Sequence, residues 1–364
     1  MKIKRLLVKL IKEYLYRRTY IAPRECYANN DLKAKLNSPA IKPIDEEQKR
    51  RITDFWGKYS VKFNMGWFDF FNTIAPNATH LEYYIPHDLY YCKLDPYFSN
   101  IQLSRVFDNK NMYDLYFHDV PQPKTLVRIV NGFIQDNNYQ FIDIEKAISL
   151  CEANSHIIIK PSIDSEGGAG IRFWNNKTNS REELEALLTD GGNYIFQSVV
   201  NQCNQLAQIH PNSLNTIRII TLIHNNEVIP LSSILRMGRG GASVDNAASG
   251  GCYCGINHDG TLKDIAYDSL GNKYAEHPQG GILSKYKIPN FYKCVDMVKF
   301  LAPRLSHISK LCSWDICVDS NDMPLLIEVN LSYGDVQLHQ ITNGPIFGDM
   351  TATILNEVFS NNRL

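Results

Sequence analysis

The sequence lacks a long apolar run, a regular cysteine spacing and an excess of charge of either sign. No stretch approaches the about 18 consecutive apolar residues of a transmembrane helix, and the start is too often interrupted by charge for a signal peptide. The nine cysteines are scattered, so neither a zinc site nor a disulfide framework is expected. Basic and acidic residues number 38 each, so no overall field favours nucleic acid. We expect a cytoplasmic protein with reduced thiols and no nucleic-acid partner.

One segment is strongly charged, and it lies at the start of the chain. Among residues 1–18, "MKIKRLLVKLIKEYLYRR", seven are basic and only Glu13 is acidic. The apolar residues recur at helical spacing opposite the lysines and arginines, which predicts an amphipathic basic helix. Such a helix fits peripheral contact with an anionic membrane surface, on its inner face. The alternatives are packing on its own domain or on the same helix of a homodimer.

The remaining chain divides by pattern into an α+β protein. Residues 1–40 are expected to form the basic helix and a linker, and residues 41–123 a helical, aromatic-rich region with a helix cap at Asp45. Residues 124–200 alternate strands and helices, with "TLVRIVNGFI" as one strand. Residues 201–364 combine alternating apolar residues with the turns "NN", "DG" and "SND", which predicts a meandering antiparallel sheet. A helix over residues 291–308 is expected to cover it.

The stretch "IIIKPSIDSEGGAGIRFW" places a lysine at the end of a strand, before a glycine-rich turn. Glycine lets backbone N–H groups approach phosphates because no Cβ intervenes, and Lys160 adds a positive charge. Since Lys160 precedes Gly167, Gly168 and Gly170, the stretch is not a P-loop. A strand–turn–strand hairpin also needs glycines, so this motif alone leaves both interpretations open.

A second group of polar residues lies in "SWDICVDSNDMPLLIEVN". Asp315 falls on one predicted strand, and Glu328 and Asn330 fall on its hairpin partner. Alternate residues of a strand face the same side, so Glu328 and Asn330 point together and Asp315 can join them. Two carboxylates and an amide oxygen are hard ligands that suit Mg²⁺. Glu328 interrupts the apolar run "LLIEV", which makes a purely structural explanation poorest for this residue.

In this order the motifs resemble ATP-grasp enzymes, in particular the sugar-transfer-associated ATP-grasp proteins of surface-polysaccharide biosynthesis. The resemblance covers roughly residues 45–345 and implies an ATP-grasp fold, with residues 124–200 as the lid and 201–364 as the core. The strand "YIFQSVV" resembles the hinge between lid and core. One departure follows it, since the next residues are "NQCNQLAQ", where many relatives have a ribose-binding glutamate. The resemblance implies phosphate contacts by Lys110, Lys160 and the loop Ser165–Gly170, adenine contacts by the backbone around Gln197 and Val199, acyl-phosphate contacts by Arg218, Arg236 and Asn246, and metal binding by Asp315, Glu328 and Asn330.

The resemblance also implies the reaction. An ATP- and Mg²⁺-dependent ligase, with Mn²⁺ as the alternative ion, would activate a small-molecule carboxylate as an acyl phosphate. It would then join the acid to an amine or hydroxyl of a glycan or sugar-linked acceptor, in capsule or other surface-polysaccharide synthesis. The alternatives are a phosphotransferase that acts on a sugar hydroxyl and a non-catalytic nucleotide-binding partner of glycosyltransferases. His210, His277 and His339 are candidate bases, with His277 the best placed.

Overall fold

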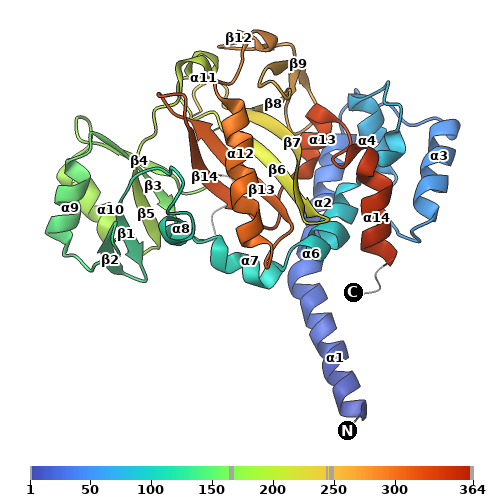
Figure 1. Ribbon diagram of the computed structural model, residues 1–364, viewed down its shortest axis with the longest axis horizontal. Helices are drawn as coiled ribbons and strands as arrows, with labels where there is room; N and C mark the ends of the chain where they lie inside the picture. The colour runs from blue at the N-terminus through green and yellow to red at the C-terminus, as the bar shows by residue number, and fades with distance from the viewer. Residues whose placement is uncertain (1, 164–167, 243–244, 246–249, 361–364) are drawn as a thin grey trace.

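The computed structural model describes residues 2–163, 168–242, 245 and 250–360. Two main antiparallel sheets are flanked by helices (Figure 1), which confirms the α+β class. A five-stranded sheet belongs to residues 125–198 and a seven-stranded sheet to residues 217–330. The helices between residues 22 and 98 and the last two helices of the chain lie on the same side of the larger sheet. Within the described residues, no helix is both long and apolar enough to cross a bilayer.

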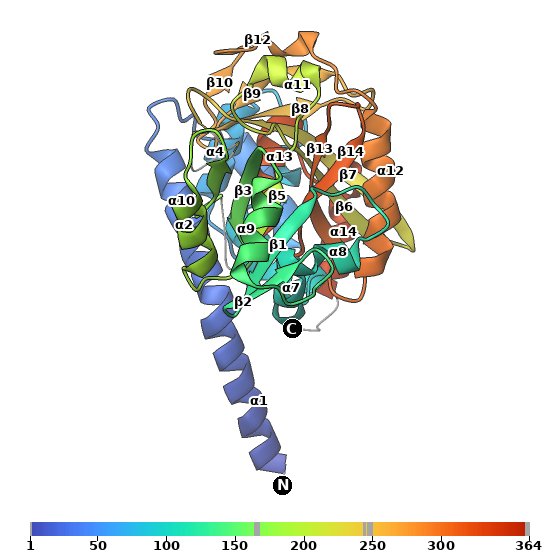
Figure 2. The same ribbon diagram turned by 90° about the vertical axis from the view of Figure 1, so that its left-hand side faces the viewer.

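The first helix continues directly into the body of the protein. Helix α1 (Lys2–Tyr16), the π-helical turn η1 (Arg17–Ile21) and α2 (Ala22–Leu36) follow one another without a gap. Helix α1 projects away from the body (Figures 1 and 2), and the predicted amphipathic helix is confirmed. The stretch expected as a linker is mostly α2 instead, because Ala28 and Leu32 bury their side chains in the core beside it.

The region expected to be helical is a series of short helices. Asp45 caps the first of them, since its side chain accepts a hydrogen bond from the Gln48 N–H at 2.7 Å and the Gln48 side chain accepts one from the Asp45 N–H. The helices are α3 (Glu46–Gly57), α4 (Gly66–Ile74), α5 (His87–Leu89), α6 (Asp95–Phe98), α7 (Ile101–Phe107) and α8 (Tyr113–Tyr116), with the turns η2 (Leu81–Tyr83), η3 (Tyr90–Leu94) and η4 (Lys110–Met112).

The smaller sheet has the strand order β2-β1-β5-β3-β4, with antiparallel neighbours. The single strand predicted over "TLVRIVNGFI" is wrong. Asn131 and Gly132, with φ of 51° and 81°, turn this stretch into a hairpin, because both central positions of such a turn need positive φ. The elements are β1 (Thr125–Val130), β2 (Phe133–Asp136), α9 (Ile144–Glu152), β3 (His156–Pro161), β4 (Arg172–Asn175), α10 (Arg181–Thr189) and β5 (Tyr194–Ser198).

The larger sheet has the strand order β10-β9-β8-β7-β6-β13-β14 and is antiparallel, as predicted. Its strands are β6 (Ile217–His224), β7 (Glu227–Met237), β8 (Cys252–Ile256), β9 (Leu262–Tyr267), β10 (Lys273–Tyr274), β13 (Leu311–Val318) and β14 (Pro324–Asn330). Around it lie α11 (Asn204–Ile209), the strand pair β11 (Glu276–His277) and β12 (Gly281–Ile282), α12 (Phe291–Leu301), α13 (Val336–Asn343) and α14 (Thr351–Ser360).

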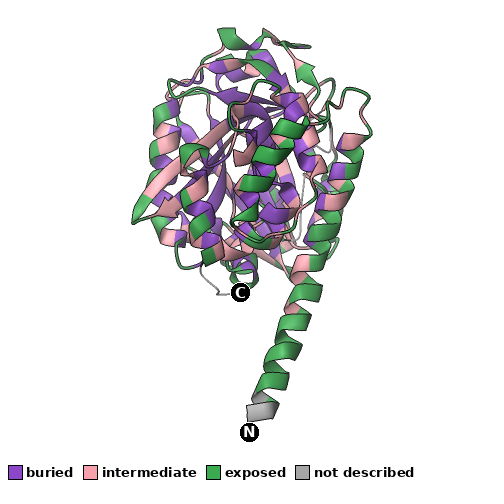
Figure 3. Ribbon diagram, turned by 90° about the vertical axis from the view of Figure 1, so that its right-hand side faces the viewer, coloured by how far each residue is buried: buried purple, intermediate pink, exposed green. Residues whose placement is uncertain are grey.

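The larger sheet separates two hydrophobic cores. One core includes Ile219 and Trp314 and lies against the predicted covering helix, α12. The other includes Ile220 and Ile234, together with the aromatic residues of the helical region and residues of α13 and α14. Because residues 28–98 and 336–358 share this second core, the helical region packs as a layer on the sheet. Figure 3 shows buried residues throughout this body and an exposed α1.

A β-bulge re-aims the end of β14. Asp315 pairs with Glu328, but the next residue of β13, Ile316, pairs with Leu326, so Ile327 is an extra residue. As a result Leu326 and Val329, three positions apart, both join the core beside α12. Since a regular strand would put them on opposite faces, the bulge frees Glu328 to face the other side with Asp315.

Candidate nucleotide and metal site

Strand pairing brings three charged residues together on one face of the larger sheet. In the register, Asp315 of β13 lies opposite Arg218 of β6 and, on its other side, opposite Glu328 of β14. Asn330 follows two residues after Glu328 at the end of the same strand. The three predicted metal ligands are therefore neighbours in space, and one predicted arginine stands directly beside them.

Asp315 is 4% exposed, and its carboxylate is bound by two arginines. The Nε and Nη2 atoms of Arg218 donate to its two oxygens at 2.7 Å each, and Arg236 Nη1 donates at 2.8 Å. Burial alone would raise the pKa of Asp315, but the two guanidinium groups hold it below its ordinary value. Asp245, which the sequence analysis missed, lies 3.3 Å from Arg236 Nη2. Its place beside the predicted residue Asn246 is the one signal that points to it.

The two predicted phosphate-binding lysines converge near Glu328. Lys110 Nζ, in the turn η4 of the helical region, lies 3.2 Å from Glu328 Oε1 of the larger sheet. Lys160, near the end of β3 in the smaller sheet, interacts electrostatically with both Glu328 and Lys110. Burial lowers the pKa of Lys160 to about 8, with Glu328 opposing the shift and Lys110 adding to it. Two cationic groups from separate segments suit a polyanion such as a triphosphate.

The segment that carries Lys110 closes the outer edge of β14 and ties it to the smaller sheet. The Tyr113 hydroxyl lies 3.2 Å from both the N–H and the carbonyl of Val329, the residue between the two predicted metal ligands of β14. Arg128 of β1 is fully buried and donates to the Asn111 carbonyl at 3.2 Å. Tyr113 therefore positions the edge strand, whose backbone would otherwise lack partners there. No sequence motif marked this residue.

In the hinge between the two sheets, at the end of β5, a backbone N–H group is already bonded within the protein. The Val199 N–H donates to the His156 carbonyl at 3.2 Å. The buried Gln197 side chain turns inward, and its Nε2 lies 3.5 Å from the Pro123 carbonyl and 3.4 Å from Thr125 Oγ1. An adenine contact through the Val199 amide would have to replace the bond to His156. The adenine contacts at Gln197 and Val199 stay a prediction.

The glycine-rich loop is described only in part. Gly168 and Gly170 both have φ of 75°, and a Cβ at Gly170 would lie 2.8 Å from Pro161 Cγ. Glycine at position 170 is therefore required by the local backbone and by the close approach of a proline. Three predicted site residues lie outside the described residues: Ser165, Gly167 and Asn246.

His277, the favoured candidate base, is fully engaged with the backbone. Its Nε2 lies 2.8 Å from the Gly238 carbonyl, and its Nδ1 accepts from the N–H groups of Gln279 and Gly280 at 3.2 Å each. Because a carbonyl needs a donor and an N–H needs an acceptor, the hydrogen bonds assign a neutral ring with its proton on Nε2. This role is structural, and neither nitrogen is available to accept a proton from a substrate.

The other two candidate histidines are also buried. His210 Nδ1 lies 2.9 Å from Ser213 Oγ, and its Nε2 lies 3.3 Å from the Gly240 carbonyl. His339 of α13 contacts Ser232 Oγ through Nδ1 at 2.8 Å, and its Nε2 has no hydrogen-bond partner among the described residues. Burial and the nearby arginines lower the pKa of His339 to about 3. It is a neutral group behind the Asp315 cluster.

The oxygen donors at the end of β14 fit a hard divalent cation. Glu328 is part-exposed and uses Oε1 for Lys110, and Asn330 lies two residues further along the same strand. Asp315 is committed to two guanidinium groups, so metal binding by this residue stays a prediction. No group of three histidine, cysteine or acidic residues suited to a metal occurs within residues 2–163, 168–242, 245 and 250–360. A carboxylate, an amide and nucleotide phosphates are nevertheless a donor set that Mg²⁺ accepts.

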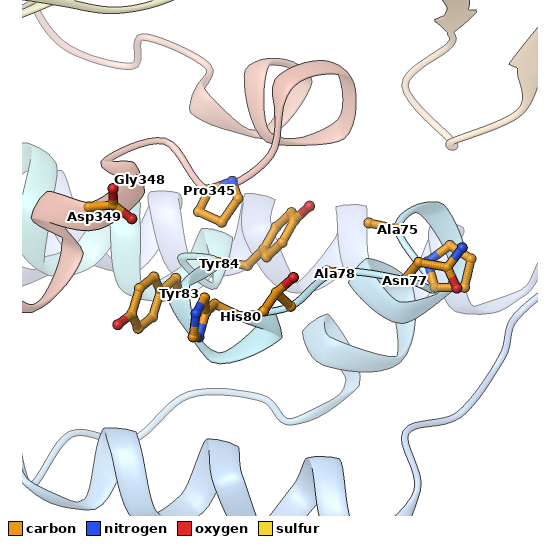
Figure 4. Close-up of a pocket in the computed structure, with 11 residues that line it drawn as sticks. Ala75, Asn77, Ala78, His80, Tyr83, Tyr84, Pro345, Gly348 and Asp349 are labelled. Atoms are coloured by element: carbon orange, nitrogen blue, oxygen red, sulfur yellow. The ribbon is translucent and has the colours of Figure 1, made fainter.

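A surface pocket of about 500 Å³ lies away from these groups. It is lined by residues 75–80, 83–84, 345 and 348–349, which come from the helical region and from the segment after α13 (Figure 4). His80 stacks on Tyr83 with ring centroids 4.7 Å apart. The pocket contains none of the predicted site residues, so it is separate from the predicted nucleotide site.

Comparison with solved structures finds low similarity to two synthetases and a ligase. It aligns with D-alanyl-alanine synthetase A from Vibrio cholerae at 12% identity and a TM-score of 0.40, over 70% of this chain and 63% of that one. It aligns with D-cycloserine synthetase DcsG at 14% identity and 0.42, over 71% and 73% of the two chains. For an L-amino acid ligase from Bacillus licheniformis the values are 12% and 0.36, over 70% and 47%.

Comparison with curated proteins found no match. Residues 93–354, by contrast, match the family described as sugar-transfer associated ATP-grasp. This range contains all the predicted site residues, both sheets and α13, and it makes up more than two thirds of the chain. The chain belongs to the sugar-transfer-associated ATP-grasp family.

Proposed function

We propose that the chain is an ATP- and Mg²⁺-dependent ligase that activates a small-molecule carboxylate as an acyl phosphate. The acid would then pass to an amine or hydroxyl of a glycan or sugar-linked acceptor, in capsule or other surface-polysaccharide synthesis in the cytoplasm. Family membership supports ATP chemistry. The observation that carries the proposal is the convergence of Lys110, Lys160 and Glu328 at the end of the Arg218–Asp315 row.

The two lysines would bind the nucleotide phosphates and position them. Lys110 comes from the turn η4 of the helical region and Lys160 from the smaller sheet, so the phosphates would bridge these two parts of the protein. Their charges act at a partly buried site, where electrostatic attraction is stronger than in water. Neither lysine reacts, and the rate gain would come from holding the terminal phosphate in line with the substrate carboxylate.

The two arginines would stabilise the anion that forms during phosphate transfer. A guanidinium group has five N–H donors, and Arg218 and Arg236 commit only some of theirs to Asp315 and Asp245. The remaining donors suit a carboxylate or phosphate oxygen. Asp315 and Asp245 hold the two guanidinium groups in place before the substrate binds. The arginines therefore need no reorganisation when negative charge develops on the substrate.

Glu328 and Asn330 would hold Mg²⁺, which neutralises charge on the nucleotide phosphates when bound. Lys110 would then release Glu328 and turn to the phosphates. Since neither His277 nitrogen is available, the acceptor amine or hydroxyl would lose its proton to a group supplied by the substrate or by water. The alternative products distinguish the competing functions: a ligase releases free phosphate with ADP, whereas a phosphotransferase leaves a stable phosphate ester.

Thermal unfolding with and without Mg²⁺–ATP tests the nucleotide site first. Ligand at 100 times its dissociation constant should stabilise the native state by about 2.7 kcal/mol. Glu328→Gln should lose most of this shift, whereas Glu227→Gln, at an exposed position of β7, should keep it. Phosphate release can then be screened with amino acids, sugar acids and glycan acceptors. No shift in the wild type at millimolar nucleotide would overturn the ligase and favour a non-catalytic partner.

A further inference from the structure

Helix α1 exposes a continuous apolar face. Its large apolar side chains are 45–61% exposed, and Figure 3 shows no buried residue along the projecting part. Isolated helices of this length are marginal in water, and exposed apolar surface of this extent marks an interaction site. The side chains are Leu6, Leu7, Val8, Leu10, Ile11, Tyr14 and Leu15.

The charge of the helix selects the partner. Residues 1–18 hold seven of the 38 basic residues and one of the 38 acidic residues, which leaves the rest of the chain with an excess of acidic groups. Two copies of the helix face to face would bring two cationic segments together, and like charges oppose that contact. An anionic lipid surface satisfies both faces, because it offers acyl chains to the apolar residues and headgroups to Lys9 and Lys12.

A buried cluster fixes the helix to the body. Arg24 of α2 is fully buried, pairs with Asp95 and lies 3.7 Å from the centroid of the Tyr333 ring. The Tyr333 N–H donates to Asp95 at 3.2 Å, and Tyr333 follows Asn330 by three residues. The helix and the loop that leaves the candidate metal strand therefore share one anchoring point.

We propose that α1 docks the protein on an anionic membrane surface, with its apolar face among the acyl chains and its lysines at the headgroups. Through α2 and the Arg24–Asp95–Tyr333 cluster, docking holds the nucleotide site in a fixed orientation to the membrane. The bound lipids are anionic because the basic residues attract negatively charged headgroups. The apolar face alone would not discriminate between headgroups. This inference does not depend on the proposed ligase activity.

Vesicle flotation of the full chain tests the proposal. The protein should float with phosphatidylcholine vesicles that contain about 30% phosphatidylglycerol, and much less with pure phosphatidylcholine, since the basic residues contribute most of the attraction. Leu7→Glu/Leu10→Glu should weaken partitioning at least about tenfold. The matched control, Tyr292→Glu/Phe300→Glu, changes side chains of α12 that are 60% and 56% exposed and should bind like the wild type.

Two further measurements keep the outcomes separate. The unfolding temperature of Leu7→Glu/Leu10→Glu should equal that of the wild type, because both leucines are exposed, and its Mg²⁺–ATP shift should be unchanged. Sedimentation velocity tests the competing partner. A wild type that ignores anionic vesicles overturns the proposal. A dimer that these two substitutions abolish, without vesicle binding, assigns the face to a second copy instead.

Discussion

Replacing Lys160 by methionine should stabilise the nucleotide-free chain and abolish its response to ATP. The pKa of Lys160 is about 8, below its ordinary value of 10.5. Each unit of difference corresponds to about 1.4 kcal/mol, so a charged lysine at this site costs on the order of 3 kcal/mol at pH 7. The attraction to Glu328 is already included in that pKa, whereas packing at the new methionine is not, so we expect a gain of about 1–3 kcal/mol.

The pH dependence gives the test its sign. Between pH 8 and 10.5 the unfolded wild type binds a proton at Lys160 that the native state lacks, so wild-type stability rises with pH. The advantage of Lys160→Met should therefore be complete below pH 8 and shrink by about 1.4 kcal/mol for each pH unit above it. Urea unfolding at pH 7, 8 and 9 measures this, with Lys177→Met at an exposed position as control.

The result that would refute this reasoning is a loss of stability in Lys160→Met that stays constant from pH 7 to 9. It would mean that the ammonium group contributes to the fold instead of being strained by burial. A stabilised variant that still responds to Mg²⁺–ATP would confirm the cost of burying the charged lysine. It would contradict the proposed contact between Lys160 and the nucleotide phosphates.

Three further predictions concern the support of the site. Asp315→Asn removes the carboxylate that binds Arg218 and leaves Arg236 with Asp245 alone, so it should cost about 3–5 kcal/mol in urea unfolding; a cost below 1 kcal/mol would contradict the ion-pair network. Tyr113→Phe removes the hydroxyl from the backbone of Val329 and should cost about 1–2 kcal/mol and weaken Mg²⁺–ATP binding in calorimetry; unchanged binding would argue against edge positioning. The unfolded state takes up a proton at His339 as pH falls from 6.5 towards 3 and the native state does not, so wild-type stability should fall in that range. His339→Gln should reduce the slope by about 1.4 kcal/mol per pH unit, and an identical slope would show that His339 titrates normally.

The elements were predictable where one local signal dominates. The cap at Asp45 and the amphipathic period of residues 1–18 depend on neighbours within one or two turns. The hairpin at Asn131–Gly132 has a local signal too, but the apolar residues on both sides of the turn favour one continuous strand, and that prediction is wrong. The bulge at Ile327 has no such signal, since only the demand to bury both Leu326 and Val329 in one core produces it.

For the site, residue types and their order were predictable, and the partners were not. The sequence by itself determined that Lys160 ends one strand and that Asp315 and Glu328 lie on two paired strands, because strand periodicity places polar residues that interrupt apolar runs. Only the tertiary structure decided that Asp315 binds Arg218, 97 positions away. Register between distant strands depends on how whole faces pack, and a pairing energy between two charges in water is too small to specify it.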